Sequence, residues 1–255
     1  MSKSAKRELE VVRTTRITPH MQRITLGGEK LADFPADQES AYIKLIFPRG
    51  EAERPLMRTY TIRHQRALEI DVDFALHEHM GPASEWAVNV KPGDRILVGG
   101  PGAKKLIQPQ ADWFLLAGDM TALPAISVNL ATLPDDARGH AVIEIAHPED
   151  KQPLVHPENL QLHWVINPQP DPTGSPLLDK VKSLPWPNGQ PAVWAACEFG
   201  SMRALRRWFK QVHEVPKSHL YVSSYWKIGQ TEDGHKLAKQ QDAMAIEELV
   251  ARKLD

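Results

Sequence analysis

The sequence predicts two domains: a six-stranded antiparallel β-barrel over residues 1–108, followed by an α/β domain with a parallel sheet over residues 109–255. Three observations support this prediction. Short strand-like segments separated by turn residues fill the first part, and a connector rich in Pro, Gly and Gln follows at 101–110. Beyond it, apolar segments alternate with helix-like segments, which is typical of a parallel sheet with covered faces.

The first part contains the strands of the expected barrel. We expect them at 9–16, 21–26, 41–47, 58–63, 68–77 and 95–98. In the clearest strand, 68–77, apolar residues alternate with Glu69, Asp71 and Asp73, so the three carboxylates should face water. A Gly-Pro pair then begins a short helix at 82–89, because proline at the first helical position loses no useful N–H group. Closure into a barrel removes the exposed edges that so many short strands would leave.

The second part alternates strands and helices. We expect strands at 113–117, 141–146, 162–166, 192–196 and 219–223, and helices at 123–133, 177–184, 202–212 and 237–253. A continuous apolar run such as 113–117 is typical of a strand that is buried on both faces. In the third helix, Met202, Leu205, Phe209 and Val212 recur at helical spacing and should form its packed face.

The composition limits the function classes. Hydrophobic residues make up 42% of the chain and charged residues 25%, which is ordinary for a soluble protein. The net charge of −1 gives no long-range attraction to nucleic acid or to a membrane surface, and no apolar run approaches the ~20 residues of a membrane span. The N-terminal residues lack the apolar core of a signal peptide, and the single Cys197 excludes a disulfide framework. We therefore expect a cytoplasmic monomer without a nucleic-acid or membrane partner.

The segment Arg58-Thr59-Tyr60-Thr61-Ile62-Arg63 places guanidinium groups, an aromatic ring and hydroxyls on one expected strand. A flat conjugated cofactor with an anionic tail needs such groups, because its ring needs an apolar surface and its phosphates need a cation. Alternation places Arg58 and Tyr60 on one face and Thr59, Thr61 and Arg63 on the other. Taken alone, the segment equally fits an exposed strand with a half-buried tyrosine.

Two helix starts offer N–H groups to an anion. One is Gly81-Pro82-Ala83-Ser84, and the other is the turn Gly118-Asp119-Met120-Thr121 after a buried strand. The second turn lacks the G-x-G-x-x-G fingerprint, so an ordinary capped turn explains it equally. Cys197 precedes a further helix start, which would lower the pKa of its thiol, although a lone cysteine at a strand end is usually a packed residue.

Two other groups of residues allow more than one interpretation. His77 and His79 lie on the same side of a strand, but no third ligand stands at a metal-binding spacing, so we expect no metal site. Tyr225 and Trp226 stand side by side at the end of the last strand. Exposed aromatic rings are costly to leave in water, so they either pack between the domains or cover a ligand.

Taken together, the motifs resemble the siderophore-interacting proteins, which are flavin-dependent ferric-siderophore reductases of the ferredoxin-reductase superfamily. The matching residues are Arg58-Thr-Tyr-Thr-Ile-Arg63, Leu76-His77, Gly81-Pro-Ala-Ser-x-Trp-Ala87, Gly118-Asp119-x-Thr121-Ala-Leu-Pro-Ala-Ile126 and Tyr225-Trp226-Lys227-x-Gly229. They occur in the family's order, and the resemblance runs from about residue 8 to about residue 236. No single motif is specific, but the series is.

The resemblance implies a FAD-binding barrel, an α/β domain like those that bind NAD(P)H, and three sets of site residues. The FAD site would consist of Arg58, Thr59, Tyr60, Thr61, Arg63, His77, Gly81, Pro82, Ala83, Ser84, Trp86, Thr121, Tyr225 and Trp226. The NADPH or NADH site would consist of Gly118, Asp119, Cys197, Glu198 and Arg203. A ferric siderophore would contact Lys44, Lys227, Lys236 and Lys239, each of which could equally be a solvated surface lysine. Within the FAD site, Arg58 would pair with the phosphates, Tyr60 would stack on the isoalloxazine and Thr61 would bind near N5.

The expected activity is therefore reduction of iron(III) in ferric siderophores, with release of iron(II) in the cytoplasm. No side chain need act as acid, base or nucleophile, because the cofactor carries the chemistry. Ferredoxin stays open as the donor, and the mixed charges at 147–151 do not choose between NADH and NADPH. The alternatives are a general flavin reductase that serves a partner protein and a siderophore-binding module without enzymatic activity.

Overall fold

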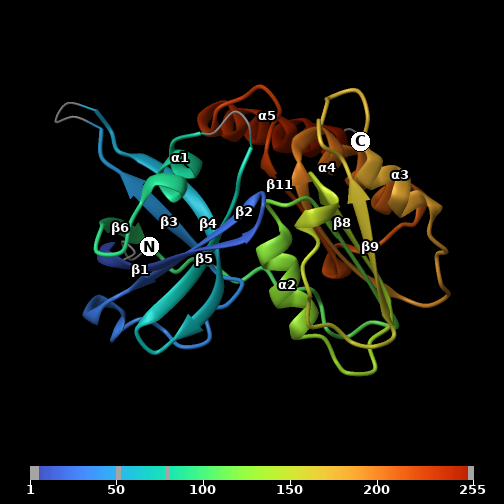
Figure 1. Cartoon of the computed structure of the whole chain (residues 1–255). Coiled ribbons are helices and arrows are strands. Elements are labelled where there is room, and N and C mark those ends of the chain that lie inside the picture. The colour runs from blue at the N-terminus through green and yellow to red at the C-terminus, as the bar shows by residue number, and fades with distance from the viewer. Residues whose placement is uncertain (1–5, 50–52, 78–80, 252–255) are drawn as a thin grey trace.

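The computed structural model of the chain describes residues 6–49, 53–77 and 81–251, and the side chains of these residues up to 247. The barrel and the α/β part lie side by side, at the left and right of Figure 1. The long helix α5 (Glu232–Ala251) runs across the top of the view, above the junction between them. The predicted fold class, an antiparallel barrel followed by a parallel α/β sheet, is confirmed.

The barrel is closed by hydrogen bonds between its first and last strands. Within the described residues its strands are β1 (Lys6–Thr18), β2 (Met21–Gly27), β3 (Tyr42–Phe47), β4 (Leu56–Arg66), β5 (Glu69–Ala75) and β6 (Arg95–Gly99). They are joined antiparallel in the order β1-β2-β5-β4-β3-β6, and β1 also pairs with β6. Fully buried side chains such as Ile24, Ile43 and Ile62 fill the interior. The helix α1 (Pro82–Asn89) starts after Gly81, as predicted, and a 3-10 turn lies at Glu29–Leu31.

Two of the three carboxylates of β5, Asp71 and Asp73, do not face water, so the prediction is wrong for them, whereas the side chain of Glu69 is partly exposed. Asp71 is only 4% exposed and Asp73 only 6%. The register places Arg23 of β2 opposite Asp73, and its Nε donates to Oδ1 of Asp73 at 2.6 Å. Thr25 donates to Asp71 at 2.7 Å, and Arg66 donates to the same carboxylate. The neighbouring strands β2 and β4 therefore supply the partners that allow these carboxylates to be buried.

The second part has a parallel sheet with helices on both faces. Its strands among the described residues are β7 (Trp113–Gly118), β8 (Gly139–Ile145), β9 (Leu160–Ile166), β10 (Pro191–Glu198) and β11 (Leu220–Trp226), in the order β11-β10-β7-β8-β9. The shorter helices are α2 (Leu123–Ala131), α3 (Pro176–Ser183) and α4 (Phe199–Arg207), with 3-10 turns η2 (Pro148–Asp150) and η4 (Lys217–His219). Helix α2 packs with Leu116 and Trp194, whereas α3 and α4 pack with Leu115 and Val193 on the opposite face. The predicted domain boundary at 108/109 falls in the segment between β6 and β7.

The helix that begins at Phe199 is not continuous over the predicted range. Its α-helical part ends at Arg207, and a π-helical turn η3 (Trp208–Val212) follows, in which the N–H of His213 donates to the carbonyl of Trp208. This wider turn rotates the end of the helix relative to the α-helical spacing. Val212 is therefore 56% exposed, and its predicted place in the core is wrong, whereas Phe209 is fully buried.

A buried carboxylate, that of Asp150, joins the barrel to the α/β part. Asp150 of η2 is fully buried and accepts hydrogen bonds from Thr18 Oγ1 at 2.8 Å and from the main-chain N–H of His20 at 3.0 Å. The Nδ1 atom of His20 lies 2.8 Å from the other carboxylate oxygen. Thr18 and His20 belong to the barrel, so this contact fixes how the barrel sits on the sheet. Among the described residues, no helix has the length and apolar character needed to cross a membrane.

Candidate flavin and chelate site

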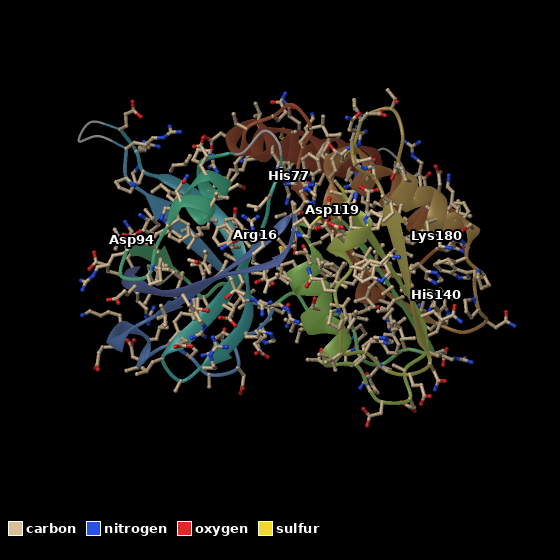
Figure 2. All side chains as sticks on the ribbon, in the orientation of Figure 1. Arg16, His77, Asp94, Asp119, His140 and Lys180 are labelled. Atoms are coloured by element: carbon tan, nitrogen blue, oxygen red, sulfur yellow. The ribbon has the colours of Figure 1, made fainter. Side chains whose placement is uncertain are left out.

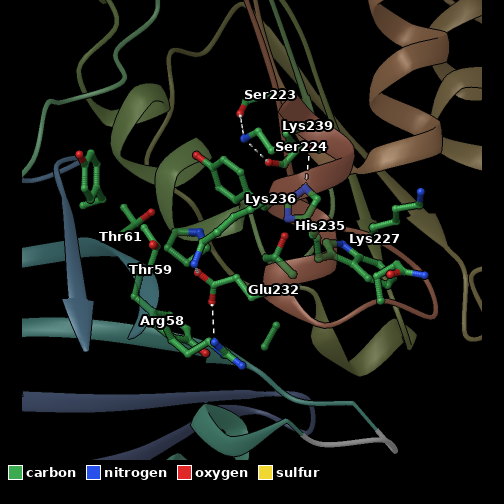
Figure 3. Close-up of a pocket in the computed structure, with 18 of the residues that line it drawn as sticks. Arg58, Thr59, Thr61, Ser223, Ser224, Lys227, Glu232, His235, Lys236 and Lys239 are labelled. Carbon is green, nitrogen blue, oxygen red and sulfur yellow. Dashed lines mark hydrogen bonds and ion pairs between the residues drawn. The ribbon is translucent and has the colours of Figure 1, made fainter. Parts of the chain in front are cut away.

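A cavity of about 470 Å³ lies between the barrel and the carboxyl end of the sheet. Figure 3 shows Arg58, Thr59 and Thr61 of β4 facing the end of β11 and the first turns of α5 across this space. The volume is within the range of about 300–1,000 Å³ that is usual for small-molecule sites. The residues from the predicted sets that line it are Arg58, Thr59, Tyr60, Thr61, His77, Ser84, Thr121, Tyr225, Trp226, Lys227, Lys236 and Lys239.

Strand β4 changes its pairing partner within the predicted flavin motif. Residues up to Thr61 pair with β3, whereas β5 pairs with β4 only from Ile62 onward. In the part of the chain that the structure describes, β4 at 58–61 is therefore paired on one edge only, and the edge that faces away from β3 has no partner strand. This explains why four consecutive residues line the cavity although neighbouring side chains point to opposite faces. The open edge also leaves main-chain groups available to the heteroatoms of a ligand.

The aromatic residues of the barrel wall are packed from behind. Tyr60 lies on Phe74, with ring centroids 4.2 Å apart, and Phe74 in turn contacts Trp86 at 5.7 Å. Burial, with a smaller effect of Glu232, raises the pKa of Tyr60, so its hydroxyl keeps its proton at any physiological pH. Trp86 does not line the cavity and instead packs against Phe74, the ring that supports Tyr60.

The guanidinium of Arg58 already has an anionic partner. Its Nη1 lies 3.2 Å from a carboxylate oxygen of Glu232, at the start of α5, and Glu232 also lies 3.1 Å from Nζ of Lys236. Both Arg58 and Glu232 are mostly buried, with side chains 17% and 19% exposed. A carboxylate thus occupies the position that the resemblance assigns to phosphate. The arrangement shows that Arg58 can bind an anion from this side.

The opposite wall is fixed by Asp119, at the end of β7. Its carboxylate is 6% exposed and accepts hydrogen bonds from the indole Nε1 of Trp226 at 2.8 Å and from the main-chain N–H of Glu198 at 2.9 Å. The N–H of Thr121 donates to the other oxygen at 3.0 Å. Burial raises the pKa of Asp119, although these hydrogen bonds favour its ionised form.

Trp226 links this wall to the barrel. Its ring is stacked near that of His77, with centroids 5.9 Å apart and planes 29° apart. Figure 2 shows His77 and Asp119 at the junction of the two parts. Burial lowers the pKa of His77, so its imidazole is neutral at pH 7. Together Trp226 and His77 present a flat aromatic surface to the cavity.

The residues predicted to contact a nicotinamide lie behind the cavity wall instead of in it. Cys197 is 1% exposed, and burial together with nearby carboxylates raises the pKa of its thiol, so the predicted lowering is wrong. Glu198 caps α4 by accepting from the N–H groups of Gly200 and Ser201, the second at 3.1 Å. Gly118 has no room for a side chain, since a Cβ would lie 2.5 Å from the carbonyl of Ala196.

Arg203 is also engaged in holding the fold. Its Nε lies 3.2 Å from Asp242 of α5, and Arg206 contacts the same carboxylate at 2.7 Å. This pairing joins α4 to α5 on the side away from the cavity lining. The predicted nicotinamide residues are thus occupied with capping, close packing and ion pairing.

The remaining predicted residues lie near the cavity but outside its lining. Lys44 stands opposite Thr59 across β3 and β4. Arg63 lies close to Asp73, and burial lowers the pKa of its guanidinium. Gly81, Pro82 and Ala83 form the start of α1 behind the wall. Residues 78–80, which include the predicted pair partner His79, lie outside the described residues.

Several lining residues escaped the sequence analysis. They are Tyr42, Asp73, Ala75, Lys105, Pro124, Tyr221, Ser223, Ser224, Gln230, Thr231, Glu232 and His235. Glu232 and His235 belong to the first turn of α5, and the predicted start of this helix, at 237, is five residues too late. A helix-start signal was present, because Thr231 precedes two acidic residues and its Oγ1 accepts from the N–H of Gly234 at 3.3 Å.

The cavity fits a flavin followed by an anionic group. The open strand edge and the hydroxyls of Thr59 and Thr61 suit ring heteroatoms, and Tyr60 and Trp226 provide flat apolar surface. The charged lining residues are mostly cations: Arg58, Lys105, Lys227, Lys236 and Lys239. The two carboxylates of the described lining, Asp73 and Glu232, are both paired with cations. An anionic ligand would therefore meet an excess of positive charge. In the described part of the chain, no cluster of side chains is arranged to hold a bare metal ion.

Known proteins resemble the chain along almost its whole length. Residues 111–229 match the family model of siderophore-interacting proteins, and residues 10–55 and 49–105 match the siderophore-interacting FAD-binding domain. Ferric vibriobactin reductase ViuB of Vibrio cholerae is 32% identical over 251 residues, which cover 90% of this chain and 92% of that protein. The siderophore-interacting protein SipS from Aeromonas hydrophila superposes with a TM-score of 0.83 at 38% identity, covering 95% of this chain and 99% of that one. A siderophore utilization protein from T. fusca gives a TM-score of 0.82 at 32% identity, covering 91% and 96%.

Proposed function

Because the chain belongs to the siderophore-interacting protein family, we propose that it is a FAD-dependent reductase that converts iron(III) in a ferric siderophore to iron(II). One observation carries the proposal. The same cavity joins an open strand edge with aromatic walls to a cluster of lysines, so a flavin and an anionic iron chelate can lie side by side. Iron(II) is held less tightly than iron(III) by hard oxygen ligands and would leave the chelate.

The residues of β4 would hold the flavin. Thr59 and Thr61, with the open edge between them, would bind the ring heteroatoms, and Tyr60 would support the ring because Phe74 prevents it from yielding. Arg58 would bind the anionic tail after exchanging its contact with Glu232. When bound, FAD supplies the redox chemistry, since it accepts a hydride and can pass on single electrons.

The walls would keep water from the reacting groups and keep the chelate in place. Trp226 is held by Asp119 at 2.8 Å and cannot turn away from the cavity without breaking that buried hydrogen bond. The ammonium groups of Lys227, Lys236 and Lys239 would attract the negative charge of the chelate. The homology to ferric vibriobactin reductase supports a chelate of iron as the substrate.

We further propose NADPH or NADH as the donor and the cytoplasm as the place of iron release, with the protein acting as a monomer. A reduced ferredoxin is the alternative donor. The side chains of Asp119, Glu198 and Arg203 are already engaged in hydrogen bonds and an ion pair within the fold. A nicotinamide would therefore have to bind main-chain groups at this edge of the sheet.

The decisive experiment is a visible absorption spectrum of the purified protein after incubation with FAD. We expect flavin bands that NADPH or NADH bleaches and that a ferric siderophore restores, with iron(II) captured by a chromogenic chelator. Bleaching by reduced ferredoxin alone would change the donor and keep the reductase. A protein that takes up no FAD, or a reduced flavoprotein that ferric siderophores do not reoxidise, would refute the proposal. Replacing Arg58 and Tyr60 by alanine should abolish flavin uptake.

A further inference from the structure

We propose that His235 and Ser224 deliver the proton that a siderophore oxygen takes up when iron is released. The inference rests on the proposed function, and it assigns a chemical role to a side chain where the cofactor had been expected to suffice. His235 lies in the first turn of α5 and Ser224 lies on β11, and both line the cavity.

The reaction requires a proton for every oxygen that is freed. Siderophores bind iron(III) through deprotonated oxygens, and an oxygen that loses the metal is basic. In the balanced step, iron(III) takes one electron from the reduced cofactor, one iron–oxygen bond breaks, and an O–H bond forms with the proton of the His235 imidazolium. The imidazole then takes a replacement proton from water. A positioned acid therefore protonates the oxygen as its bond to iron breaks, so that no unprotonated, negatively charged oxygen has to form.

The geometry brings the two side chains together in a fixed arrangement. Nε2 of His235 lies 2.8 Å from Oγ of Ser224, and the two residues are only 5% and 1% exposed. The main-chain N–H of His235 donates to the carbonyl of Thr231 at 2.8 Å, and the ring of Phe199 packs edge-on against the imidazole. No hydrogen-bond partner for Nδ1 of His235 is found among the described side chains and main-chain groups. One nitrogen is thus committed to Ser224, and the other is free to exchange a proton.

The charges around His235 make its protonation depend on the ligand. Burial, followed by the nearby ammonium groups of Lys239, Lys227 and Lys236 in decreasing order of effect, lowers the pKa of His235 to about 4. Of the two carboxylates in this turn of the helix, Glu232 is paired with Arg58 and Lys236, and Asp233 lies near Lys236. The imidazole is therefore neutral at pH 7 while no anionic ligand lies beside these lysines.

An anionic chelate would reverse this balance. Its negative charge would screen the lysines and favour the imidazolium, so chelate binding would load His235 with a proton from water. When iron leaves, the freed oxygen is a stronger base than the imidazole, so the proton passes from His235 to that oxygen. Figure 3 shows His235, Ser224 and Lys239 joined by hydrogen bonds, with Lys239 donating to the carbonyl of Ser224 at 3.0 Å. The network thus places the acid among the cations that would bind the chelate.

The first test uses a substrate that cannot be reduced. The gallium(III) complex of a tris-catecholate siderophore has the charge of the iron(III) complex, and histidine ring protons report protonation by NMR. On binding to the flavin-loaded protein, we expect the titration midpoint of His235 to rise by at least about two pH units, as an adjacent opposite charge requires. If the complex binds and the midpoint stays in place, the inference is overturned, whether or not the protein proves to be a reductase.

The second test compares iron release in variants. His235→Gln keeps a partner for Ser224 but cannot carry a proton. We expect iron(II) release to slow by about 100-fold, as for the loss of a general acid, and its dependence on pH and on deuterated water to disappear. His219→Gln, at the other end of β11, is the matched control and should behave as the wild type.

The outcomes separate the two proposals. A wild-type protein that binds the gallium complex but does not reduce the iron(III) complex refutes the proposed function, while the NMR titration still reads His235 directly. A His235→Gln protein that releases iron(II) at the wild-type rate, with the wild-type pH dependence and isotope effect, overturns the proton-delivery role. A variant that loses affinity for FAD or for the gallium complex, with an unchanged isotope effect, would show that His235 only holds α5 in place and would also overturn it.

Discussion

Replacing Asp119 by asparagine should be the most damaging isosteric change at the site. One carboxylate oxygen accepts from the N–H and hydroxyl of Thr121, at 3.0 and 2.5 Å. The other accepts from the N–H of Glu198 at 2.9 Å and from Trp226 Nε1 at 2.8 Å. The side-chain amide of asparagine has one oxygen and one NH2 group, so it can accept hydrogen bonds at only one of the two positions. At the other position its NH2 group must face a main-chain N–H, which is also a donor. The N–H of Glu198 is buried, and that of Thr121 is partly buried.

The magnitude follows from the bonds that are lost. Two charge-assisted hydrogen bonds contribute about 1.5–3 kcal/mol each, which gives about 3–6 kcal/mol. Part of this is offset because the variant no longer buries a charge, and burial raises the pKa of Asp119 by disfavouring that charge. We therefore expect Asp119→Asn to lower the free energy of unfolding by about 2–4 kcal/mol. Trp226→Phe, which removes a single donor and keeps the ring, should lower it by about 1–2 kcal/mol.

Urea unfolding of the apoprotein measures this directly, and a fluorescence titration with FAD measures the effect on the site. Since the indole of Trp226 loses its anchor, FAD should bind about 10-fold more weakly to Asp119→Asn, the equivalent of about 1.4 kcal/mol. Asp135→Asn, on the exposed turn after α2, serves as the control. An Asp119→Asn protein within about 0.5 kcal/mol of this control, with unchanged FAD affinity, would refute the structural role assigned to the carboxylate.

Three further predictions concern other carboxylates. Burial raises the pKa of Glu144 to about 7 from a usual value of 4.5, so its protonated form stabilises the fold at acid pH and that stability is lost as the pH rises from 4.5 through 7. Glu144→Gln should accordingly raise the free energy of unfolding by up to about 3 kcal/mol at pH 8 and hardly at pH 4, and an equal effect at both would contradict this. Glu232→Gln frees Arg58, so the apoprotein should bind FAD about 3- to 10-fold more tightly by fluorescence titration, and weaker binding would show that the pair holds the site open. Asp150→Ala leaves the donors of His20 without an acceptor, and urea unfolding should show a loss of about 3–5 kcal/mol, whereas an unchanged midpoint would rule out this contact as the link between the two parts.

Local pattern was enough to predict most elements of the fold. The continuous apolar runs became β7 and β10, buried along their whole lengths, and alternation identified β5. Alternation could not predict the burial of Asp71 and Asp73, because their partners come from β2, about fifty residues earlier, and from the end of β4. It also could not predict the exposure of Val212, since a π-helical turn changes the spacing on which the pattern depends.

The flavin side of the site was easier to predict than the rest. Arg58 to Thr61 are consecutive, so their joint presence is visible in the sequence, whereas the change of pairing that leaves one edge of β4 open there is a property of the closed barrel. His235 and Ser224 meet only because α5 returns to the end of β11, and nothing in their separation of 11 residues indicates a contact. For Cys197 the sequence predicted the wrong direction of the pKa shift. A helix start was expected to lower the pKa of its thiol, but burial beside carboxylates has the larger effect.

The cavity is framed by carboxylates that differ in one respect. Asp150 joins the barrel to the sheet and Asp119 joins β7 to β10 and β11, and both are buried with hydrogen bonds to each oxygen. Glu232 joins α5 to β4, but it lies at the edge of the cavity and is bound only to flexible cationic side chains. An entering anion can replace the carboxylate of Glu232 at Arg58 without orphaning a main-chain group, whereas replacing either aspartate would orphan at least one. Ligand entry should therefore move the start of α5, which carries His235, while the two sheets keep their relative position.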